Sequence, residues 1–115
     1  MKTIIHCIKK SIWDEIQNQN SYTTSMLDDE GFIHCSDVET FHLVADFMFK
    51  DDKETLVLLC IDTSKIQAEV VWEDLYNAGI DFPHIYGPLN LDSVIAVLPF
   101  LRDKEGKFVL NDELK

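Results

Sequence analysis

The chain has 115 residues, 46% of them hydrophobic, and 21 acidic against 10 basic side chains give it a formal net charge of −11. This length and apolar content predict a single domain over residues 1–115. The negative charge repels phosphate backbones, so nucleic acid is not expected as a partner. The basic first segment lacks a signal-peptide cleavage site, and no apolar stretch is long enough to span a membrane. We therefore expect a cytoplasmic protein without a membrane partner.

The first segments predict a strand, a helix and a polar loop. Residues 3–8 are apolar and β-branched, which indicates a buried strand that carries His6. Residues 11–17 have apolar side chains at helical spacing, and residues 21–30 are polar. The cysteines Cys7, Cys35 and Cys60 lie in apolar runs without CxxC spacing. They are expected to be buried small hydrophobes, not disulfides or zinc ligands.

Residues 31–36, with the sequence GFIHCS, form the next predicted strand, in which alternation places His34 and Ser36 on one face. Ser36 followed by Glu39 has the spacing of a capping box, so a helix is predicted over residues 37–49. His34 would then lie beside a helix N-terminus, where backbone N–H groups favour anions. The alternative is that Ser36 only caps the helix and His34 makes a structural hydrogen bond.

The second half of the chain reads mainly as strands. Residues 54–62 are a continuous apolar run, typical of a central strand buried on both faces. Residues 69–75 predict a strand with Glu73 on one face, and residues 93–101 predict another, in which Pro99 indicates an edge or a bulge. Residues 106–110 are expected to close the sheet. Helices near the N-terminus followed mostly by strands predict an α+β fold.

The stretch FPHIYGPLN at residues 82–90 places a histidine, a tyrosine and a glycine between two prolines. Each proline fixes its own φ and restricts the residue before it, so the stretch is predicted to be a stiff loop that holds His84 and Tyr86. Polar aromatic side chains on a rigid loop are common in ligand sites. The alternative is a tight crossover whose rings fill the core.

Several strings together resemble the small bacterial family known as domain of unknown function 952. They are IIHCI, GFIHCS, LVLLCID, VVWEDL and FPHIYGPLNLDSVIAVLPF, and they extend over nearly the whole chain. This resemblance implies a shared fold but carries no established activity.

The strings IIHCI and GFIHCS also resemble the paired first and second motifs of the ADP-ribosyltransferase superfamily, particularly its RNA 2′-phosphotransferase branch. This resemblance implies a split, mixed sheet that grips NAD or a related nucleotide. It implies that His6 bonds the nicotinamide-side ribose and that His34 holds the second position. Ser36 would assist a phosphate, and Tyr86 would stack on the nicotinamide ring.

The same resemblance implies a third motif, whose catalytic residue is a glutamate in the superfamily. Glu73 and His84 are the candidates for this position, and His34 is a further catalytic candidate. The chain departs from the family pattern after the first histidine, where Cys7 and Ile8 replace the usual Gly-Thr. The enzyme reading is a NAD-utilising transferase or hydrolase. A nucleotide-binding module without catalysis is expected instead if no glutamate lies near the histidines.

A third reading rests on the chemistry of histidine alone. His6, His34 and His84 could together ligate zinc and leave an open position for water, as in a metal-dependent hydrolase. Their irregular spacing matches no metal motif, so a metal is not expected. All three readings require the three imidazoles to converge on one site.

Overall fold

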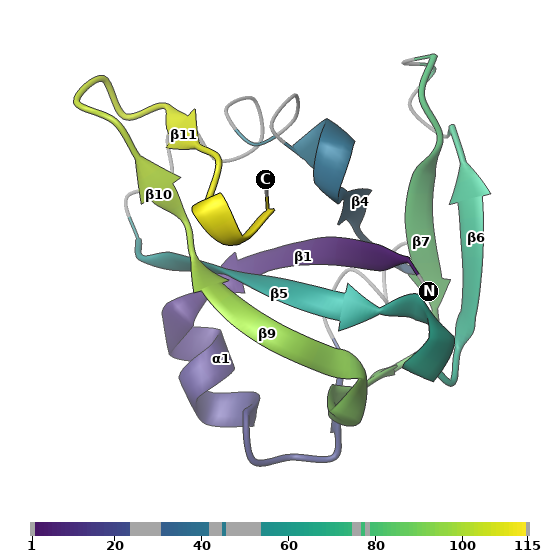
Figure 1. Ribbon diagram of the computed structural model, residues 1–115. Coiled ribbons are helices and arrows are strands. Elements are labelled where there is room, and N and C mark those ends of the chain that lie inside the picture. Colours follow the sequence, from purple (N-terminus) through teal and green to yellow (C-terminus); the bar gives the residue numbers. More distant parts are fainter. Residues whose placement is uncertain are drawn as a thin grey trace.

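The computed structural model describes residues 2–23, 31–41, 45, 54–74, 77 and 79–114. It confirms an α+β protein made mostly of strands (Figure 1). The sheet is split into a four-stranded sheet of order β4-β1-β5-β9 and a three-stranded sheet of order β3-β7-β6. Each described strand pair is antiparallel, whereas a mixed sheet was expected. Among the described residues, no helix is long and apolar enough to cross a bilayer.

The four-stranded sheet is built around β1 and β5, which pair along their whole lengths. Every residue of β5 is buried, which confirms the prediction of a central strand. The strand β9 forms one edge of this sheet, as its proline predicted. The members of the sheet are β1 (Thr3–Lys9), β4 (Ser36–Asp37), β5 (Leu56–Asp62) and β9 (Val94–Pro99).

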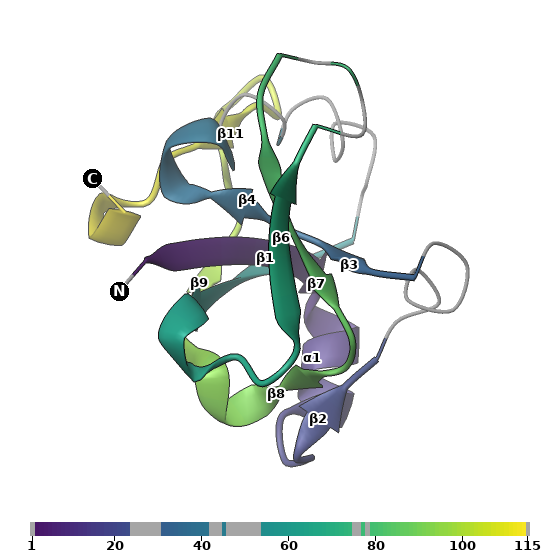
Figure 2. The ribbon, with the colours of Figure 1, turned by 90° about the vertical axis from the view of Figure 1, so that its right-hand side faces the viewer.

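The three-stranded sheet consists of β3 (Ile33–His34), β6 (Glu69–Glu73) and β7 (Phe82–Tyr86). Its strands β6 and β7 run across the direction of β1 (Figure 2). Cys35 alone separates β3 from β4, so a single extended stretch passes from one sheet to the other. The predicted strand at residues 31–36 therefore joins the two sheets.

The prediction of a loop at residues 82–90 is wrong for its first half, because β7 is the middle strand of the three-stranded sheet. Pro83 lacks an N–H group, but its carbonyl still accepts a hydrogen bond from Cys35 N at 3.1 Å. The described pairing with β3 involves His84 and Ile85, which follow the proline. The sheet thus tolerates a proline in a central strand because its carbonyl remains bonded.

Both predicted helices are found within the described residues. Helix α1 (Lys10–Ile16) matches the first prediction closely. Residues 38–41 and 45 are helical, while the rest of the predicted helix at 37–49 lies outside the described residues. The predicted capping box is wrong, because the Asp37 carboxylate accepts bonds from both Thr40 N and Thr40 Oγ1 at 2.7 Å. The strand β4 extends through Asp37, so the helix starts one residue later than the capping box requires.

Short elements complete the chain. Residues 21–22 pair with β8 and were predicted as loop, while residues 24–30 lie outside the described part. Residues 106–110 contribute a strand that pairs with β10 in a separate ribbon and does not close the sheet, contrary to prediction. These elements are β2 (Ser21–Tyr22), β8 (Leu89–Asn90), β10 (Leu101–Arg102) and β11 (Phe108–Val109), with 3-10 turns η1 (Thr63–Lys65), η2 (Leu91–Ser93) and η3 (Asp112–Leu114).

Two apolar clusters lie on opposite faces of β1. Ile4 and Ile8 belong to the first cluster, which includes residues of both sheets, and Ile5 belongs to the second. By strand alternation, His6 shares the face of Ile4 and Ile8 and points towards the three-stranded sheet. Cys35 and Cys60 are buried as predicted, whereas Cys7 is only partly buried.

Replacing Gly87 with alanine is expected to lower the free energy of unfolding by about 1–3 kcal/mol. Gly87 follows β7 with φ of +153°, and a Cβ there would lie 3.0 Å from the Ala68 Cβ. Urea denaturation of Gly87→Ala measures the loss. Gly106→Ala is the matched control, because Gly106 has φ of +83° but open space around it. A smaller loss at position 87 than at 106 would contradict the importance of the Ala68 contact.

Candidate functional site

Two of the predicted histidines face each other across neighbouring strands. His34 on β3 is the register partner of His84 on β7. Their rings lie 5.3 Å apart, and His34 Nδ1 is 3.3 Å from His84 Nε2. Cross-strand partners point to the same face of a sheet, so the pairing follows directly from the register.

Glu73 on β6 extends this contact. Its Oε2 lies 2.9 Å from His84 Nδ1 and also accepts a hydrogen bond from the Tyr86 hydroxyl. Glu73 lies opposite Phe82, so alternation places its side chain on the face that carries His84 and Tyr86. The three strands of the sheet therefore each supply part of one hydrogen-bonded row, His34–His84–Glu73, which we call the relay.

His6 reaches the relay from the other sheet. Its Nδ1 lies 2.7 Å from the carbonyl oxygen of His34. A carbonyl only accepts, so Nδ1 carries the proton and Nε2 of neutral His6 holds a lone pair. That Nε2 is buried and has no hydrogen-bond partner among the residues that the structure describes. The His6 ring also lies 5.8 Å from the ring of Tyr22.

Burial and hydrogen bonding set the charges of the relay. Burial, and then the charges of His84 and His6, lower the pKa of His34 from 6.5 to about 4. Burial also lowers the pKa of His6, although its bond to His34 opposes this. Hydrogen bonds from Tyr86 and His84 lower the pKa of Glu73. At neutral pH the relay thus contains a carboxylate at one end and an uncharged imidazole at the other.

The carboxylate fixes the direction of the hydrogen bonds. Because ionised Glu73 only accepts, His84 Nδ1 must donate to it. In neutral His84, Nε2 then accepts from Nδ1–H of His34. Proton uptake by His34 would then occur at Nε2, the ring nitrogen that is not bonded to His84. The relay therefore has the polarity of a general base whose protonated form is stabilised by a partly buried anion.

Two phenylalanines surround the relay and were not predicted. Phe32 lies 4.3 Å from the His84 ring and 5.4 Å from the Tyr86 ring, and Phe82 lies 5.6 Å from the His34 ring. Both are buried, which lowers the local dielectric and strengthens the charge interactions within the relay. Their places in the sequence could have indicated them, because each phenylalanine lies two residues before a histidine of the relay.

The structure brings together five of the six predicted site residues, namely His6, His34, His84, Glu73 and Tyr86. The rings of His34 and His84 meet, whereas the described contact of His6 is with the main-chain carbonyl of His34, so the convergence of all three imidazoles stays a prediction. The structural alternative for His34 also holds in part, because His34 bonds a fully buried His84.

Ser36 does not join these residues in the relay. It is buried in β4 opposite Ile5, and the Asp37 carboxylate occupies the helix start where a phosphate was expected. A second negative group at this helix start would be repelled by that carboxylate.

The histidines are not arranged as metal ligands. His34 Nδ1 and His84 Nε2 are directed at each other, and His6 Nδ1 is directed at a carbonyl oxygen. Among the described residues, no group of three or more histidine, cysteine, aspartate or glutamate side chains could hold a metal ion. The geometry therefore disfavours the three-histidine hydrolase.

Comparison with known proteins assigns the family. The profile described as "Protein of unknown function (DUF952)" matches residues 7–97. The chain belongs to this family. The match confirms the resemblance to the DUF952 family predicted from the sequence, and the family description states no activity. No curated protein matches the chain.

Solved structures share the fold over nearly the full length. A crystal structure of the protein CC0527 from Caulobacter crescentus has 27% sequence identity and a TM-score of 0.83, and the match covers 97% of both chains. A crystal structure of its double mutant gives 28% and 0.82, again with 97% of both chains covered. Its solution NMR structure gives 29% and 0.78, covering 98% of this chain and 97% of the other. None of these structures is described as an ADP-ribosyltransferase, so the resemblance to that superfamily is not confirmed.

Proposed function

We propose that this DUF952 protein is an enzyme that cleaves the nicotinamide–ribose bond of NAD or a related nucleotide and transfers the ribosyl group to water or another hydroxyl. The observation that carries the proposal is the Glu73 carboxylate, whose lowered pKa keeps it ionised 2.9 Å from His84 and in line with His34. The resemblance of the two histidine motifs to ADP-ribosyltransferases supports the choice of nucleotide.

The relay suits this reaction because the reaction develops positive charge on the ribose. As the N-glycosidic bond breaks, its electron pair leaves with nicotinamide, and an oxocarbenium-like centre remains. His84 and Tyr86 both bond Oε2 of Glu73, and Oε1 of the same carboxylate would stabilise that centre. The attacking hydroxyl then gives its proton to His34 Nε2, while the Nδ1 proton of His34 passes to His84. The resulting imidazolium lies beside the carboxylate.

Two further residues would bind the substrate. His6 Nε2 is a buried acceptor that no described residue bonds, and a ribose hydroxyl would satisfy it. Tyr86 is 38% exposed and packs against Phe32, so its ring offers a face on which nicotinamide can stack. The presence of Glu73 beside the histidines favours an enzyme over the module that only binds a nucleotide.

Release of nicotinamide from NAD by the purified protein tests the proposal. We expect turnover above the buffer blank, together with a higher melting temperature when NAD is added. A melting-temperature shift with NAD but no nicotinamide release would leave only the binding module. No response to NAD but a shift with zinc that a chelator reverses would instead support the metal hydrolase. A shift with tRNA alone would contradict the exclusion of nucleic acid.

A further inference from the structure

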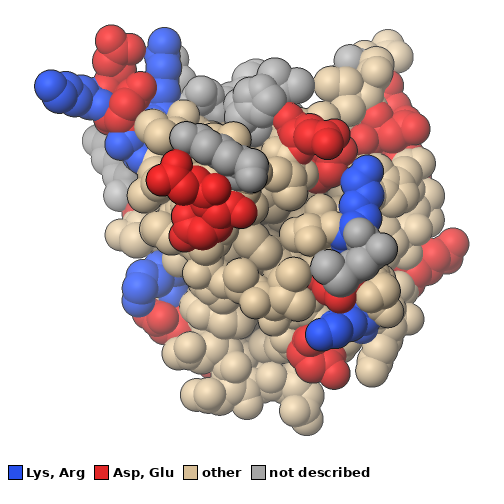
Figure 3. Space-filling view, viewed as in Figure 1, with Lys and Arg blue, Asp and Glu red and all other residues tan. Residues whose placement is uncertain are grey.

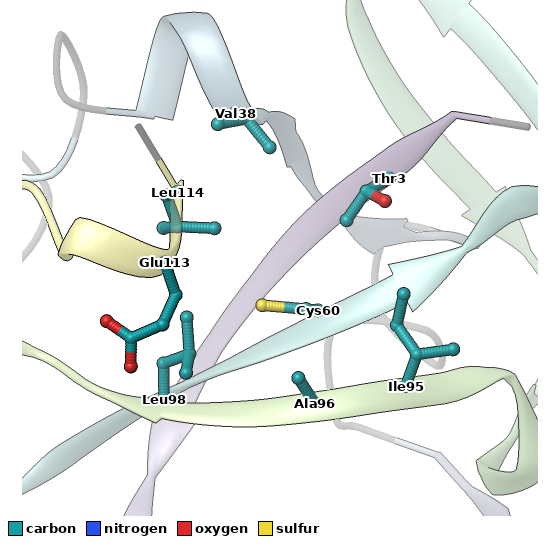
Figure 4. Close-up of a pocket in the computed structure, with 8 residues that line it drawn as sticks. All are labelled: Thr3, Val38, Cys60, Ile95, Ala96, Leu98, Glu113 and Leu114. Carbon is teal, nitrogen blue, oxygen red and sulfur yellow. The ribbon is translucent and has the colours of Figure 1, made fainter.

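A cavity lies on the face of the four-stranded sheet that is turned away from the relay. It has a volume of about 310 Å³ and is bounded by β9, the turn η3 and the helical residue Val38 (Figure 4). Cys60 lines it and is the register partner of Ile5, which belongs to the second apolar cluster. His6 points to the opposite face of β1, so this cavity is separate from the candidate active site.

A β-bulge shapes one wall of this cavity. Cys60 pairs with Ala96 while Ile61 pairs with Val94, so Ile95 is an extra residue in β9. A bulge re-aims the side chain that it carries, and bulges are enriched beside binding sites. Ile95 is 46% exposed and lines the cavity with Ala96 (Figure 4). The bulge therefore makes the exposed apolar side chain of Ile95 part of the cavity wall, whereas a regular strand would direct this side chain elsewhere.

One carboxylate, that of Glu113, lies at the edge of this apolar lining (Figure 4). Of the described residues that line the cavity, Glu113 is the one that carries charge. Its charge acts within the cavity, because burial and then Glu113 raise the pKa of the Cys60 thiol. Acidic side chains also gather over η3 (Figure 3). A ligand that fits here needs an apolar body and a positive end.

We propose that this cavity binds a small organic cation, a primary ammonium group on a short alkyl chain. The chain would pack against Ile95, Ala96 and Cys60, and the ammonium group would lie at Glu113. The net charge of −11 attracts cations to the protein in general, whereas the apolar wall selects those that carry a hydrocarbon body.

An NMR titration with hexylamine, hexanol and hexanoate tests the proposal. We expect hexylamine to shift the backbone amides of Thr3, Cys60 and Ala96. A partly exposed ion pair contributes modestly, so hexylamine should bind about three-fold more tightly than hexanol. Hexanoate should bind most weakly. Equal binding of amine and alcohol would overturn the role of charge, and shifts elsewhere or none at all would overturn the site.

Three variants sharpen this test. Glu113→Gln should bring the affinity for hexylamine down to that for hexanol, while Glu105→Gln, the same charge change on the exposed loop between β10 and β11, should not. Ala96→Leu fills the cavity and should abolish the shifts with both ligands. Hexylamine binding that survives Ala96→Leu, or an equal loss in both glutamine variants, would overturn the proposal. All three substitutions are at exposed positions, so folded protein is expected.

Discussion

Glu73→Gln is expected to lower the rate of nicotinamide release by about 100-fold or more. Glutamine keeps the shape of the side chain, and its amide oxygen can still accept a hydrogen bond from Tyr86 or His84. It lacks the negative charge that would stabilise both the cationic ribose and a protonated His84. The loss should therefore appear in kcat, because these charges develop as the glycosidic bond breaks.

Glu69→Gln is the matched control for this variant. Glu69 lies on the same strand, four residues before Glu73, and alternation places both side chains on one face. The substitution Glu69→Gln removes the same charge outside the relay, so the kcat of this variant should stay within about two-fold of that of the parent protein. An unchanged kcat in Glu73→Gln, or equal losses in both variants, would contradict the assigned role. Denaturant unfolding of each variant shows whether the fold is intact.

The strands that form the site were largely predictable because side-chain alternation is a strong local signal. The apolar run at β5 and the β-branched run at β1 both gave strands at the expected positions. Alternation also placed His6 between its apolar neighbours and His34 opposite Ile33 and Cys35. A strand histidine in a small domain has few directions in which to point, so a contact such as that between His34 and His84 could be expected from the sequence.

The strand at β7 could not be predicted because its local signals oppose its tertiary pairing. Pro83 and Gly87 are turn residues by propensity, yet β6 pairs with all five residues of β7. The helix cap failed for a related reason. Ser36 and Asp37 are both good N-cap residues, and only the pairing of β4 with β1 decides that the strand continues to Asp37.

The relay itself depends on register, which the sequence does not specify. Glu73 reaches His84 because Glu73 lies opposite Phe82. A slip of one residue would send the Glu73 side chain to the other face of the sheet, away from both His84 and Tyr86. The sequence could therefore propose Glu73 as a candidate but could not place it beside the histidines.

The free energy of unfolding is expected to fall between pH 7 and pH 5 because two histidines are uncharged in the folded protein. His34 has a pKa of about 4 when folded and about 6.5 in its ordinary state, and burial lowers the pKa of His6 as well. As the pH falls through 6.5, the unfolded chain takes up these protons and the folded protein does not. The slope is at most about 1.4 kcal/mol per pH unit for each histidine.

The contribution of His34 can be separated with the variant His34→Gln. Most carboxylates remain ionised down to pH 5, so relief of the repulsion expected at a net charge of −11 contributes little in this window. Urea denaturation at pH 7, 6 and 5 should give a shallower slope for the variant than for the parent protein. Equal slopes would mean that His34 is protonated in the folded protein at pH 5. At that pH it would enter the reaction as a cation and could not accept a proton from the attacking hydroxyl.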